Sequence, residues 1–507
     1  MKKNILQYLE EATEKHPQSI IFGDANEEIT YADFSEQTRK IGSGLLSLDC
    51  ERKNVVIFID KSIHCLLGMF GAMYANACYA IIDVTSPVER ITSIFRTLDP
   101  SVIITNAAFQ KKCAEAFSFS DIPICLIEDL QARSEDTAAL AKTRERQIDT
   151  DPLYVLFTSG STGIPKGSVI CHQSVMIYAE TIRKTFHIDA DTVWGSQTPF
   201  YFSMSILDVF TTVVAGCCLY IIPKICFSFP LMLIDFLDKK KINSIYWVPT
   251  AFSIVADVDT FSVAKPQYLK NILFAGEPMP VKQFNYWKRH LPDALYANLF
   301  GPTEITDTCT YYIVNRDIQI GESMPIGIPF DNCGILVIDE NGQEVLPGSD
   351  KEGILYVRGS FLGMGYFNNP EKTASAFVQN PLNQSYPETV YNTGDIVAYN
   401  TYGELIFKGR RDHQIKHMGH RIELGEIETA AAAIDGIDSV CCLYDKEKAE
   451  IHLVYVGKTD EEVVMNAMKG AVPHYMIPQR VSKMKKMPVN MNGKIDRLMI
   501  QKDLFWK

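Results

Sequence analysis

Short apolar segments alternate with amphipathic helical stretches along most of the chain, and this alternation constrains the fold more than any other feature of the sequence. The apolar segments Val55–Ile59, Tyr79–Ile82 and Val102–Ile104 are short and are bounded by turns or charges. Stretches with helical spacing, Ile63–Ala75 and Pro87–Thr97, lie between them. Such short, apolar runs are typical of strands that are buried on both faces of a sheet. The alternation therefore predicts layered α/β structure.

The same rhythm continues through the middle of the chain. Strands are expected at Ser244–Val248, Lys270–Phe274 and Ala294–Asn298, and a helix at Val281–His290. An amphipathic helix is also expected over residues 5–17. We therefore expect a large N-terminal domain made of layered α/β subdomains.

The most apolar stretch, Val209–Phe229, raises the question of a membrane span. Gly216, Pro223 and Lys224 interrupt it. The uninterrupted apolar runs are therefore shorter than the roughly 20 residues that a membrane helix needs. We expect buried strands in this stretch, and no association of the chain with a membrane.

Length, charge and cysteine usage narrow the class of protein. A chain of 507 residues is too long for one ordinary core and predicts two to three domains or subdomains. The formal net charge is -12 and the basic residues are dispersed, so no basic stripe is available to bind nucleic acid. The 13 cysteines have no metal-binding spacing, and no apolar signal-peptide core follows the first residues. These features favour a cytoplasmic location.

From about Gly334 the sequence no longer alternates strands with helices and instead predicts closely spaced strands. Strands with Gly and Asn turns are expected there at Ile335–Asp339, Gly353–Arg358 and Glu404–Lys408. A small α+β unit follows, with a helix at Glu423–Ala433 and strands near Val440–Tyr444 and Ile451–Tyr455. We therefore predict a core domain over residues 1–411, β-rich from about 334, and a C-terminal domain over residues 412–507.

One loop carries the strongest chemical signal. An apolar strand runs into small hydroxyl residues, glycines and a lysine: Thr158, Ser159, Gly160, Ser161, Thr162, Gly163 and Lys166. Glycines let backbone N–H groups approach phosphate oxygens, hydroxyls add donors, and Lys166 adds a positive charge. Pro165 stands where a Walker A loop has its second glycine, so this is a different kind of phosphate loop. We predict that it binds the phosphates of ATP.

This loop resembles the phosphate loop of the adenylate-forming superfamily, which contains acyl-CoA synthetases, luciferases and the adenylation domains of nonribosomal peptide synthetases. Five more motifs follow in the family's order: Gly301-Pro302-Thr303-Glu304, Tyr391-Asn392-Thr393-Gly394-Asp395, Gly409-Arg410-Arg411-Asp412, Arg421-Ile422-Glu423-Leu424-Gly425-Glu426-Ile427-Glu428 and Asn492-Gly493-Lys494-Ile495-Asp496-Arg497. The pattern is similar to that of stand-alone enzymes such as D-alanine–carrier protein ligases. The resemblance implies an ATP-dependent ligase with a small, mobile C-terminal domain.

The resemblance also implies roles for the motif residues. Glu304 would bind Mg²⁺, since one hard carboxylate together with phosphate oxygens suits that ion. Thr303 would hold the α-phosphate, and Gly301 would lie at the nucleotide. Asp395 would accept hydrogen bonds from the ribose hydroxyls, and Arg410 would contact ribose or phosphate.

Two further roles would belong to the C-terminal domain. Lys494 would bridge the substrate carboxylate and the ribose during adenylation. Asp412 would be the hinge about which this domain rotates between two half-reactions. In the second half-reaction the segment with Lys416, Gly419 and Arg421 would line the tunnel of the acceptor thiol.

The residues expected at the substrate are mostly apolar. By resemblance they are Phe202, Ser203, Met204, Leu207, Tyr246, Leu273, Ala275, Leu299, Asp307 and Thr308. Members that activate amino acids have an Asp for the α-ammonium group, and the register that matches Asp208 to the family's second acid puts Ser203 at that place. A neutral Ser is a poor partner for a buried ammonium group, which argues against an α-amino acid, including D-alanine.

Asp307 is the one acid in this set. A buried carboxylate needs a donor, and a 4-hydroxy- or 4-aminobenzoate would supply one, so an aryl acid is the expected substrate. A β- or ω-amino acid is the competing possibility. In a third interpretation Asp307 bonds Tyr246, Thr308 or backbone and never contacts the substrate.

The acceptor is expected to be a phosphopantetheine thiol on a separate carrier protein, because no carrier motif follows Lys494 in the sequence. An acyl- or aryl-CoA ligase, with free coenzyme A as acceptor, is an alternative. A non-catalytic ligand-binding protein on the same fold is a more distant one. The intact Lys494, Glu304 and Asp395 argue against it.

Overall fold

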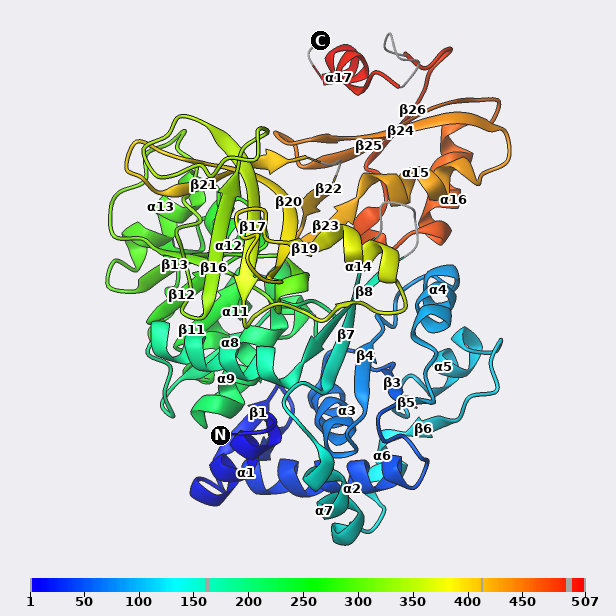
Figure 1. Ribbon diagram of the computed structural model, residues 1–507, viewed down its shortest axis with the longest axis vertical. Helices are drawn as coiled ribbons and strands as arrows, with labels where there is room; N and C mark the ends of the chain where they lie inside the picture. The colour runs from blue at the N-terminus through cyan, green and yellow to red at the C-terminus, as the bar shows by residue number, and fades with distance from the viewer. Residues whose placement is uncertain (1, 160–164, 412–413, 489–494, 506–507) are drawn as a thin grey trace. The chain divides into compact units, whose positions relative to one another are not determined.

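The computed structural model describes residues 2–159, 165–411, 414–488 and 495–505 (Figure 1). Its contacts divide the chain into two compact units. The larger unit consists of Met1–Val84, Leu98–Leu156 and Gly167–Arg411, and the smaller unit of Thr85–Thr97, Phe157–Lys166 and Asp412–Lys507.

A nine-stranded sheet of mixed direction forms one layer of the larger unit, in the order β15-β14-β13-β12-β11-β9-β10-β1-β2. Six neighbouring strands are parallel, from β13 to β1, and antiparallel strands lie at the two edges. The strands are β1 (Ile20–Gly23), β2 (Glu28–Thr30), β9 (Val193–Ser196), β10 (Cys218–Ile221), β11 (Ser244–Trp247), β12 (Asn271–Phe274), β13 (Leu295–Phe300), β14 (Thr310–Ile313) and β15 (Ile328–Pro329).

A seven-stranded sheet forms a second layer, in the order β18-β8-β7-β4-β3-β5-β6. The pairs β7–β4, β4–β3, β3–β5 and β5–β6 are parallel, whereas β18 and β8 are antiparallel. The strands are β3 (Asn54–Ile57), β4 (Cys78–Ile81), β5 (Val102–Thr105), β6 (Ile124–Leu126), β7 (Pro152–Thr158), β8 (Lys166–Cys171) and β18 (Gly365–Tyr366). Parallel strands need crossover connections, and helices supply them here.

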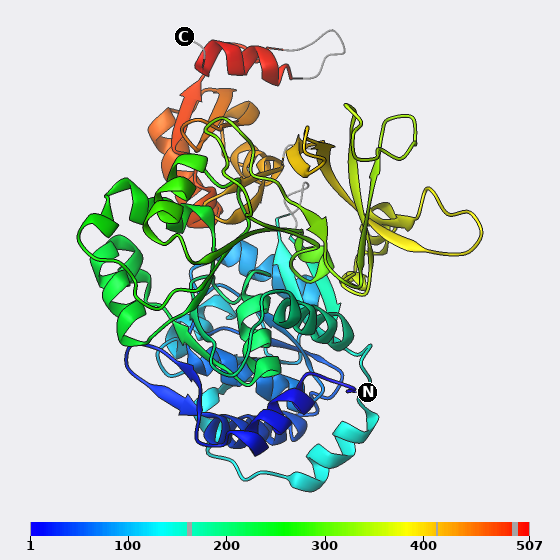
Figure 2. The same cartoon turned by 90° about the vertical axis from the view of Figure 1, so that its left-hand side faces the viewer.

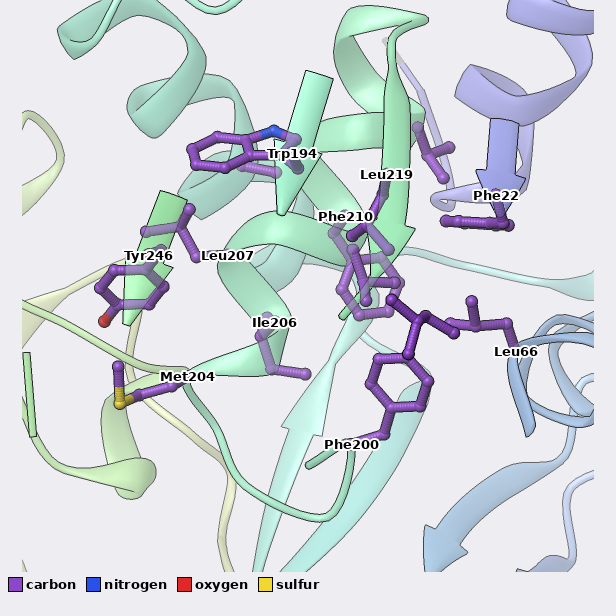
Figure 3. Close-up of a cluster of buried hydrophobic side chains, with 14 of the residues drawn as sticks. Phe22, Leu66, Trp194, Phe200, Met204, Ile206, Leu207, Phe210, Leu219 and Tyr246 are labelled. Carbon is purple, nitrogen blue, oxygen red and sulfur yellow. The ribbon is translucent and has the colours of Figure 1, made fainter. Parts of the chain in front are cut away.

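The main core lies where helices pack on these sheets. Helices α2 and α3 pack on each other, as do α8 and α9 (Figure 1). Phe22 of β1, Leu66 of α3 and Phe210 of α9 belong to one buried cluster, part of which Figure 3 draws. The helices are α1 (Leu6–Lys15), α2 (Tyr31–Leu46), α3 (Ile63–Tyr74), α5 (Gln110–Ala116), α6 (Ile127–Gln131), α7 (Thr137–Arg146), α8 (His172–Thr185), α9 (Ser205–Ala215), α10 (Lys224–Ser228), α11 (Pro230–Lys239), α12 (Pro249–Asp257) and α13 (Val281–His290).

The stretch Val209–Phe229 differs from the sequence prediction of buried strands. Its first part belongs to α9, a helix whose residues are almost all buried, and only Cys218–Ile221 form a strand, β10. A helix that is buried on most sides has no polar face, so its period cannot be read from the sequence. Gly216 ends the helix in the left-handed conformation, with φ 68°, which glycine adopts without strain.

A five-stranded antiparallel sheet completes the larger unit and stands clear at the right of Figure 2 (yellow-green to yellow). The pairs are β16 with β17, β17 with β20, and β20 with both β19 and β21. The elements are β16 (Cys333–Ile338), β17 (Glu352–Gly359), β19 (Phe377–Gln379), β20 (Thr389–Tyr399), β21 (Leu405–Arg410) and the helix α14 (Pro370–Ala376). Leu355, Val357 and Val397 are fully buried in the core of this part.

The smaller unit has its own core around α15 and a three-stranded sheet. Ile427, Leu453 and Met468 are fully buried in it. The elements are α4 (Val88–Leu98), the two-stranded hairpin β22 (Gln414–His417) and β23 (His420–Glu423), α15 (Leu424–Ala432), β24 (Ile437–Asp445), β25 (Glu450–Gly457), α16 (Glu461–Ala471), β26 (Arg480–Lys483) and α17 (Arg497–Phe505). In the part of the chain that the structure describes, every helix is too short or too polar to cross a membrane.

Candidate active site

The loop between β13 and β14 carries the motif that begins at Gly301. A β-carbon at this glycine would lie 2.5 Å from Cα of Thr308 and 2.6 Å from the carbonyl oxygen of Asp307. The backbone N–H of Cys309 donates to the carbonyl of Phe300 at 2.8 Å, which closes the loop. Glycine is therefore required here by the close passage of two backbone segments, not by its dihedral freedom.

Thr306 holds a strained turn inside this loop. Its φ of 76° and ψ of -63°, with a 3.0 Å hydrogen bond from the N–H of Asp307 to the carbonyl of Ile305, define a γ-turn of the rare, strained type. The Thr306 hydroxyl donates to the carbonyl of Phe361 at 2.9 Å. Such strain persists only where surrounding contacts hold it, and it is typical of functional sites. Its effect is to direct the chain at Asp307 back into the protein.

Glu304 is completely buried in the same loop. Its Oε1 accepts a 2.7 Å hydrogen bond from the hydroxyl of Tyr366 on β18, and its carbonyl accepts from the N–H of Gly363 at 2.8 Å. These contacts fix the orientation of the carboxylate. Among the described residues, no cluster of three or more His, Cys, Asp or Glu side chains could hold a metal alone. A single oriented carboxylate fits Mg²⁺, which keeps water and phosphate oxygens as its other ligands.

Asp395 and Arg410 form a buried ion pair. The antiparallel register of β20 and β21 places them opposite each other, and Nη1 of Arg410 lies 2.6 Å from Oδ1 of Asp395. Their side chains are only 3% and 9% exposed. The register of the sheet therefore brings the two side chains together. Both residues are expected at the ribose from the sequence.

The residues predicted at the substrate gather at the carboxyl ends of parallel strands, where open α/β sheets bind their ligands. Tyr246 lies on β11, Leu273 on β12 and Leu299 on β13, with Ala275 just after β12. Met204 and Leu207, at the start of α9, lie near Tyr246 in Figure 3. Phe202 and Ser203 are partly exposed, whereas the other predicted residues are buried.

Asp307 lies at the centre of a cluster of hydroxyl groups. Its Oδ2 accepts hydrogen bonds from Tyr178 at 2.8 Å and from Tyr246 at 3.0 Å, and the Tyr178 hydroxyl also lies 2.8 Å from Oγ1 of Thr308. Burial raises the pKa of Asp307 to about 7, and hydrogen bonds from Tyr178, Tyr246 and Ser203 oppose that rise. The bond to Tyr246 is the one named in the interpretation in which Asp307 does not contact the substrate.

Tyr178 was missed by sequence reasoning. It belongs to α8, at a helical position between other buried residues, and its spacing is that of any core tyrosine. Only the packing of α8 against the loop from Gly301 to Cys309 reveals its polar partners. No local signal in the sequence could have identified it.

A second buried acid, Asp208, lies on α9 next to Leu207 and is only 1% exposed. Burial raises its pKa, and the positive charge of Lys61 is the largest opposing influence. The Lys61 ammonium in turn lies 3.0 Å from Oγ of Ser196, at the carboxyl end of β9. Lys61 and Ser196 were not predicted as site residues. The sequence matched Asp208 to an acid of the family without identifying its counter-charge.

A single hydroxyl connects the motif loop with these substrate residues. Oγ of Ser203 lies 3.2 Å from Oγ1 of Thr303. Thr303 was predicted at the α-phosphate and Ser203 at the substrate. The fold therefore places these two residues in contact within the larger unit.

In the smaller unit, the ends of the phosphate loop contact the segment Arg421–Glu423. The Ser159 hydroxyl donates to the carbonyl of Arg421 at 2.9 Å and accepts from the N–H of Glu423 at 3.0 Å. Nζ of Lys166 lies 3.5 Å from Oε1 of Glu423. The Thr158 hydroxyl oxygen is buried and has no hydrogen-bond partner among the described residues. An orphaned hydroxyl and a partly buried lysine beside a glycine loop fit a phosphate group.

The predicted thiol-tunnel residues belong to the hairpin of β22 and β23. Lys416 pairs with Arg421 across the hairpin, and Gly419 follows Met418 in its two-residue turn, both with positive φ. Gly160, Ser161, Thr162, Gly163, Asp412 and Lys494 lie outside the described residues, so their expected roles stay predictions.

Replacing Gly301 with alanine is expected to damage the site. The new β-carbon would collide with backbone atoms at about 2.5 Å, and backbone cannot move aside as a flexible side chain can. We expect a loss of about 1–3 kcal/mol in the free energy of unfolding. Gly470→Ala in α16, where no atom lies within 4 Å of the added carbon, is the matched control and should be neutral or stabilising. Urea unfolding of both variants measures this, and equal stabilities would contradict the interpretation.

Asp307 is expected to make stability depend on pH. Its pKa is raised from 3.8 to about 7 in the folded state, so between these values the folded chain binds a proton that the unfolded chain has released. The contribution of Asp307 to stability therefore falls as pH rises from about 4 to 7. Relative to Asp307→Asn, the wild type should lose more than about 1 kcal/mol between pH 5 and 8. Urea unfolding at both pH values tests this, with the exposed Glu340→Gln as control. A constant difference would refute it.

Comparison with known proteins agrees with the motifs and the geometry. Residues 9–367 match the family model described as AMP-binding enzyme. A linear gramicidin synthase of Brevibacillus parabrevis is 32% identical over 97% of this chain, and the match covers 6% of that protein. The L-proline--[L-prolyl-carrier protein] ligase of Streptomyces coelicolor is 28% identical, over 92% of this chain and 91% of its own length.

A solved structure shares the whole fold. It is that of the Vibrio cholerae adenylation domain AlmE in complex with glycyl-adenosine-5'-phosphate, which is 21% identical to this chain with a TM-score of 0.86. The match covers 100% of this chain and 98% of AlmE. Against four large peptide synthases this chain spans only 6% to 19% of the relative's length. The family model covers well over half of the chain. The chain therefore belongs to the AMP-binding enzyme family, the adenylate-forming ligases whose motifs it carries.

Proposed function

We propose that this chain activates a small carboxylic acid with ATP to give an acyl-adenylate and pyrophosphate, and then transfers the acyl group to the phosphopantetheine thiol of a separate carrier protein. The observation that carries the proposal is the 3.2 Å contact between the hydroxyls of Thr303 and Ser203. It joins the loop proposed to hold the α-phosphate to the residues proposed to hold the acid. An acid and a phosphate held side by side are what adenylation requires.

The first half-reaction joins a carboxylate oxygen to the α-phosphorus and breaks the bond to pyrophosphate. Both reactants are anionic, so catalysis depends on screening charge and on alignment. Thr303 would donate to the α-phosphate, and the phosphate loop with Lys166 would bind the leaving phosphates. Glu304 would hold Mg²⁺, whose charge, when the ion is bound, offsets that of the phosphates. Lys494 would bind the carboxylate.

Asp395 would position the nucleotide through its ribose. One carboxylate can accept from two adjacent hydroxyls, and the Arg410 side chain 2.6 Å away keeps Asp395 oriented. By the resemblance, Arg410 would also contact ribose or phosphate. The buried pair thus supplies a rigid attachment for ATP.

In the second half-reaction a thiolate attacks the acyl carbon and AMP leaves. The carrier protein as thiol source is supported by the likeness to a carrier-protein ligase that this chain matches over 91% of its length. Lys416, Gly419 and Arg421 would line the path of the phosphopantetheine arm. Free coenzyme A is the second candidate acceptor.

The substrate proposal rests on Asp307. Two tyrosine hydroxyls donate to one of its oxygens, Oδ2, and a donor on the acid would meet the other. The sequence pointed to 4-hydroxy- or 4-aminobenzoate, and β- or ω-amino acids compete with these. An amino acid gains support from the closeness of Ser203, the expected place of an ammonium partner, to the Asp307 carboxyl, whose pKa it lowers.

Pyrophosphate exchange into ATP tests the first half-reaction. With purified protein, Mg²⁺ and a panel of aryl, aliphatic and amino acids, we expect at least one acid to drive exchange. Lys494→Ala and Glu304→Gln should lower that exchange about 100-fold or more, because each removes a charge that acts on the reacting groups. Lys351→Ala, an exposed lysine paired with Asp339, is the control and should keep full activity. Undiminished exchange in Lys494→Ala would refute the mechanism.

The proposed hinge has its own test. Asp412→Pro fixes one backbone dihedral at the junction of the two units and should hinder rotation while leaving adenylation in place. We expect exchange within about threefold of wild type and thioester formation reduced at least 10-fold, measured as acyl-carrier product by mass spectrometry. Equal slowing of both steps would exclude a hinge at this position. Running the same assay with coenzyme A decides between the two acceptors.

A further inference from the structure

The buried charges near the substrate residues do not balance. Asp208 and Asp307 are 1% and 2% exposed, and each raises the pKa of the Tyr246 phenol, so both lie near that side chain. Lys61 lies close to Asp208 and offsets its charge. A buried carboxylate without a matching cation costs several kcal/mol, so the environment of Asp307 decides what this site can bind.

The groups around Asp307 are neutral or negative. Tyr178 from α8 and Tyr246 from β11 donate to its Oδ2, and Ser203 before α9 lies close enough to lower the pKa of the carboxyl. Asp208 also lies near, and its charge opposes ionisation of Asp307. Tyr154 from β7, whose hydroxyl donates to the Thr306 carbonyl, is close enough for Asp307 to raise the pKa of its phenol. Among the described residues, the main influences on Asp307 include no cation. Hydroxyl donors stabilise a carboxylate less than a paired charge does.

The backbone is distorted to place Asp307 there. The γ-turn at Thr306 is unfavourable for a β-branched residue, and Gly301 is needed to let the loop close. If Asp307 bound no ligand, nothing would offset the free energy of this backbone strain, and an apolar residue would pack better at the same position. The combination of strain and an unbalanced acid points to a ligand that brings the missing charge.

We propose that the Asp307 carboxylate binds a primary ammonium group of the substrate, so that the acid activated by this chain is a short amino acid. This inference rests on the proposed adenylation function. The missing cation then arrives with the substrate, and the ion pair forms only in the complex. The hydroxyls of Tyr178, Tyr246 and Ser203 keep the carboxylate oriented until the ammonium group binds.

The geometry also limits the length of the substrate. The Thr303 hydroxyl, proposed at the α-phosphate, is 3.2 Å from the Ser203 hydroxyl, and Ser203 lies close enough to Asp307 to lower the pKa of its carboxyl. One hydroxyl thus separates the reacting end from the ammonium site, so the amine lies on the α or β carbon of the acid. A substituent para to the carboxylate of a benzoate lies across a whole ring and would overshoot. The 4-aminobenzoate amine is moreover a poor cation at neutral pH.

Pyrophosphate exchange with matched acid pairs tests the proposal. The amino acids are glycine, D- and L-alanine, β-alanine and 3-aminobutanoate, each compared with the same acid lacking the amine, and 4-hydroxy- and 4-aminobenzoate complete the panel. We expect one short amino acid to exceed its deaminated partner at least 100-fold in kcat/KM. Preference for a benzoate or a deaminated acid would overturn the proposal and leave adenylation intact. Exchange with no acid in a broad panel would instead reject the proposed function itself.

Asp307→Asn tests the residue directly. The amide keeps the shape and the hydrogen bonds but loses the charge, so we expect kcat/KM for the preferred amino acid to fall at least 100-fold with ATP affinity unchanged. Tyr178→Phe, which removes one neutral donor, is the matched control and should fall less than 10-fold. Activity of Asp307→Asn within threefold of wild type would overturn the proposal.

A binding measurement on the wild type keeps the test valid if Asp307→Asn fails to fold. An ammonium group beside Asp307 would lower the pKa of that carboxyl, which burial now raises to about 7. Calorimetry of the preferred amino acid at pH 7 in two buffers of different ionisation enthalpy should therefore show release of up to about half a proton. Release of no proton, or uptake of one, would overturn the proposal.

Discussion

The tight closure of the loop between β13 and β14 is the constraint on which the site depends. Two backbone segments pass so close at Gly301 that no side chain fits, and Thr306 adopts a strained turn a few residues later. Thr303 and Glu304 lie in the first half of this short loop, and Asp307 lies in its second half. The residues proposed for phosphate chemistry and for acid recognition are therefore positioned by one rigid backbone path.

Burial strengthens the electrostatic interactions of the polar residues in this region. Glu304 and Asp395 are almost inaccessible, and each is held by a defined donor, Tyr366 or Arg410. In such surroundings electrostatic interactions are stronger than in water, and an acid without a counter-charge is costly. Asp208 shares its environment with Lys61, whereas Asp307 has only hydroxyl partners among the described residues. That contrast distinguishes an acid that supports the structure from one that is suited to a charged ligand.

The sequence predicted the fold class and most elements because short apolar runs and amphipathic helices leave local patterns. It predicted α13 at the same residues that the structure shows, and the motif residues Glu304, Asp395 and Arg410 by resemblance. It was wrong for Val209–Phe229, since a helix buried on most sides has the same apolar composition as buried strands. The segment of Lys416, Gly419 and Arg421, which the resemblance assigned to the thiol tunnel, forms a hairpin that no sequence pattern had indicated.

Residue types and their order by themselves determined that this chain has a loop rich in glycine and hydroxyl residues, the motifs of the adenylate-forming superfamily and an isolated acid at position 307. Only the tertiary structure decided what surrounds that acid. Tyr178 and Lys61 are distant in sequence from Asp307 and Asp208, and they meet them because separate helices and strands pack at one end of the sheets. Local patterns encode secondary structure, whereas the partner of a buried charge is fixed by packing over long sequence separations.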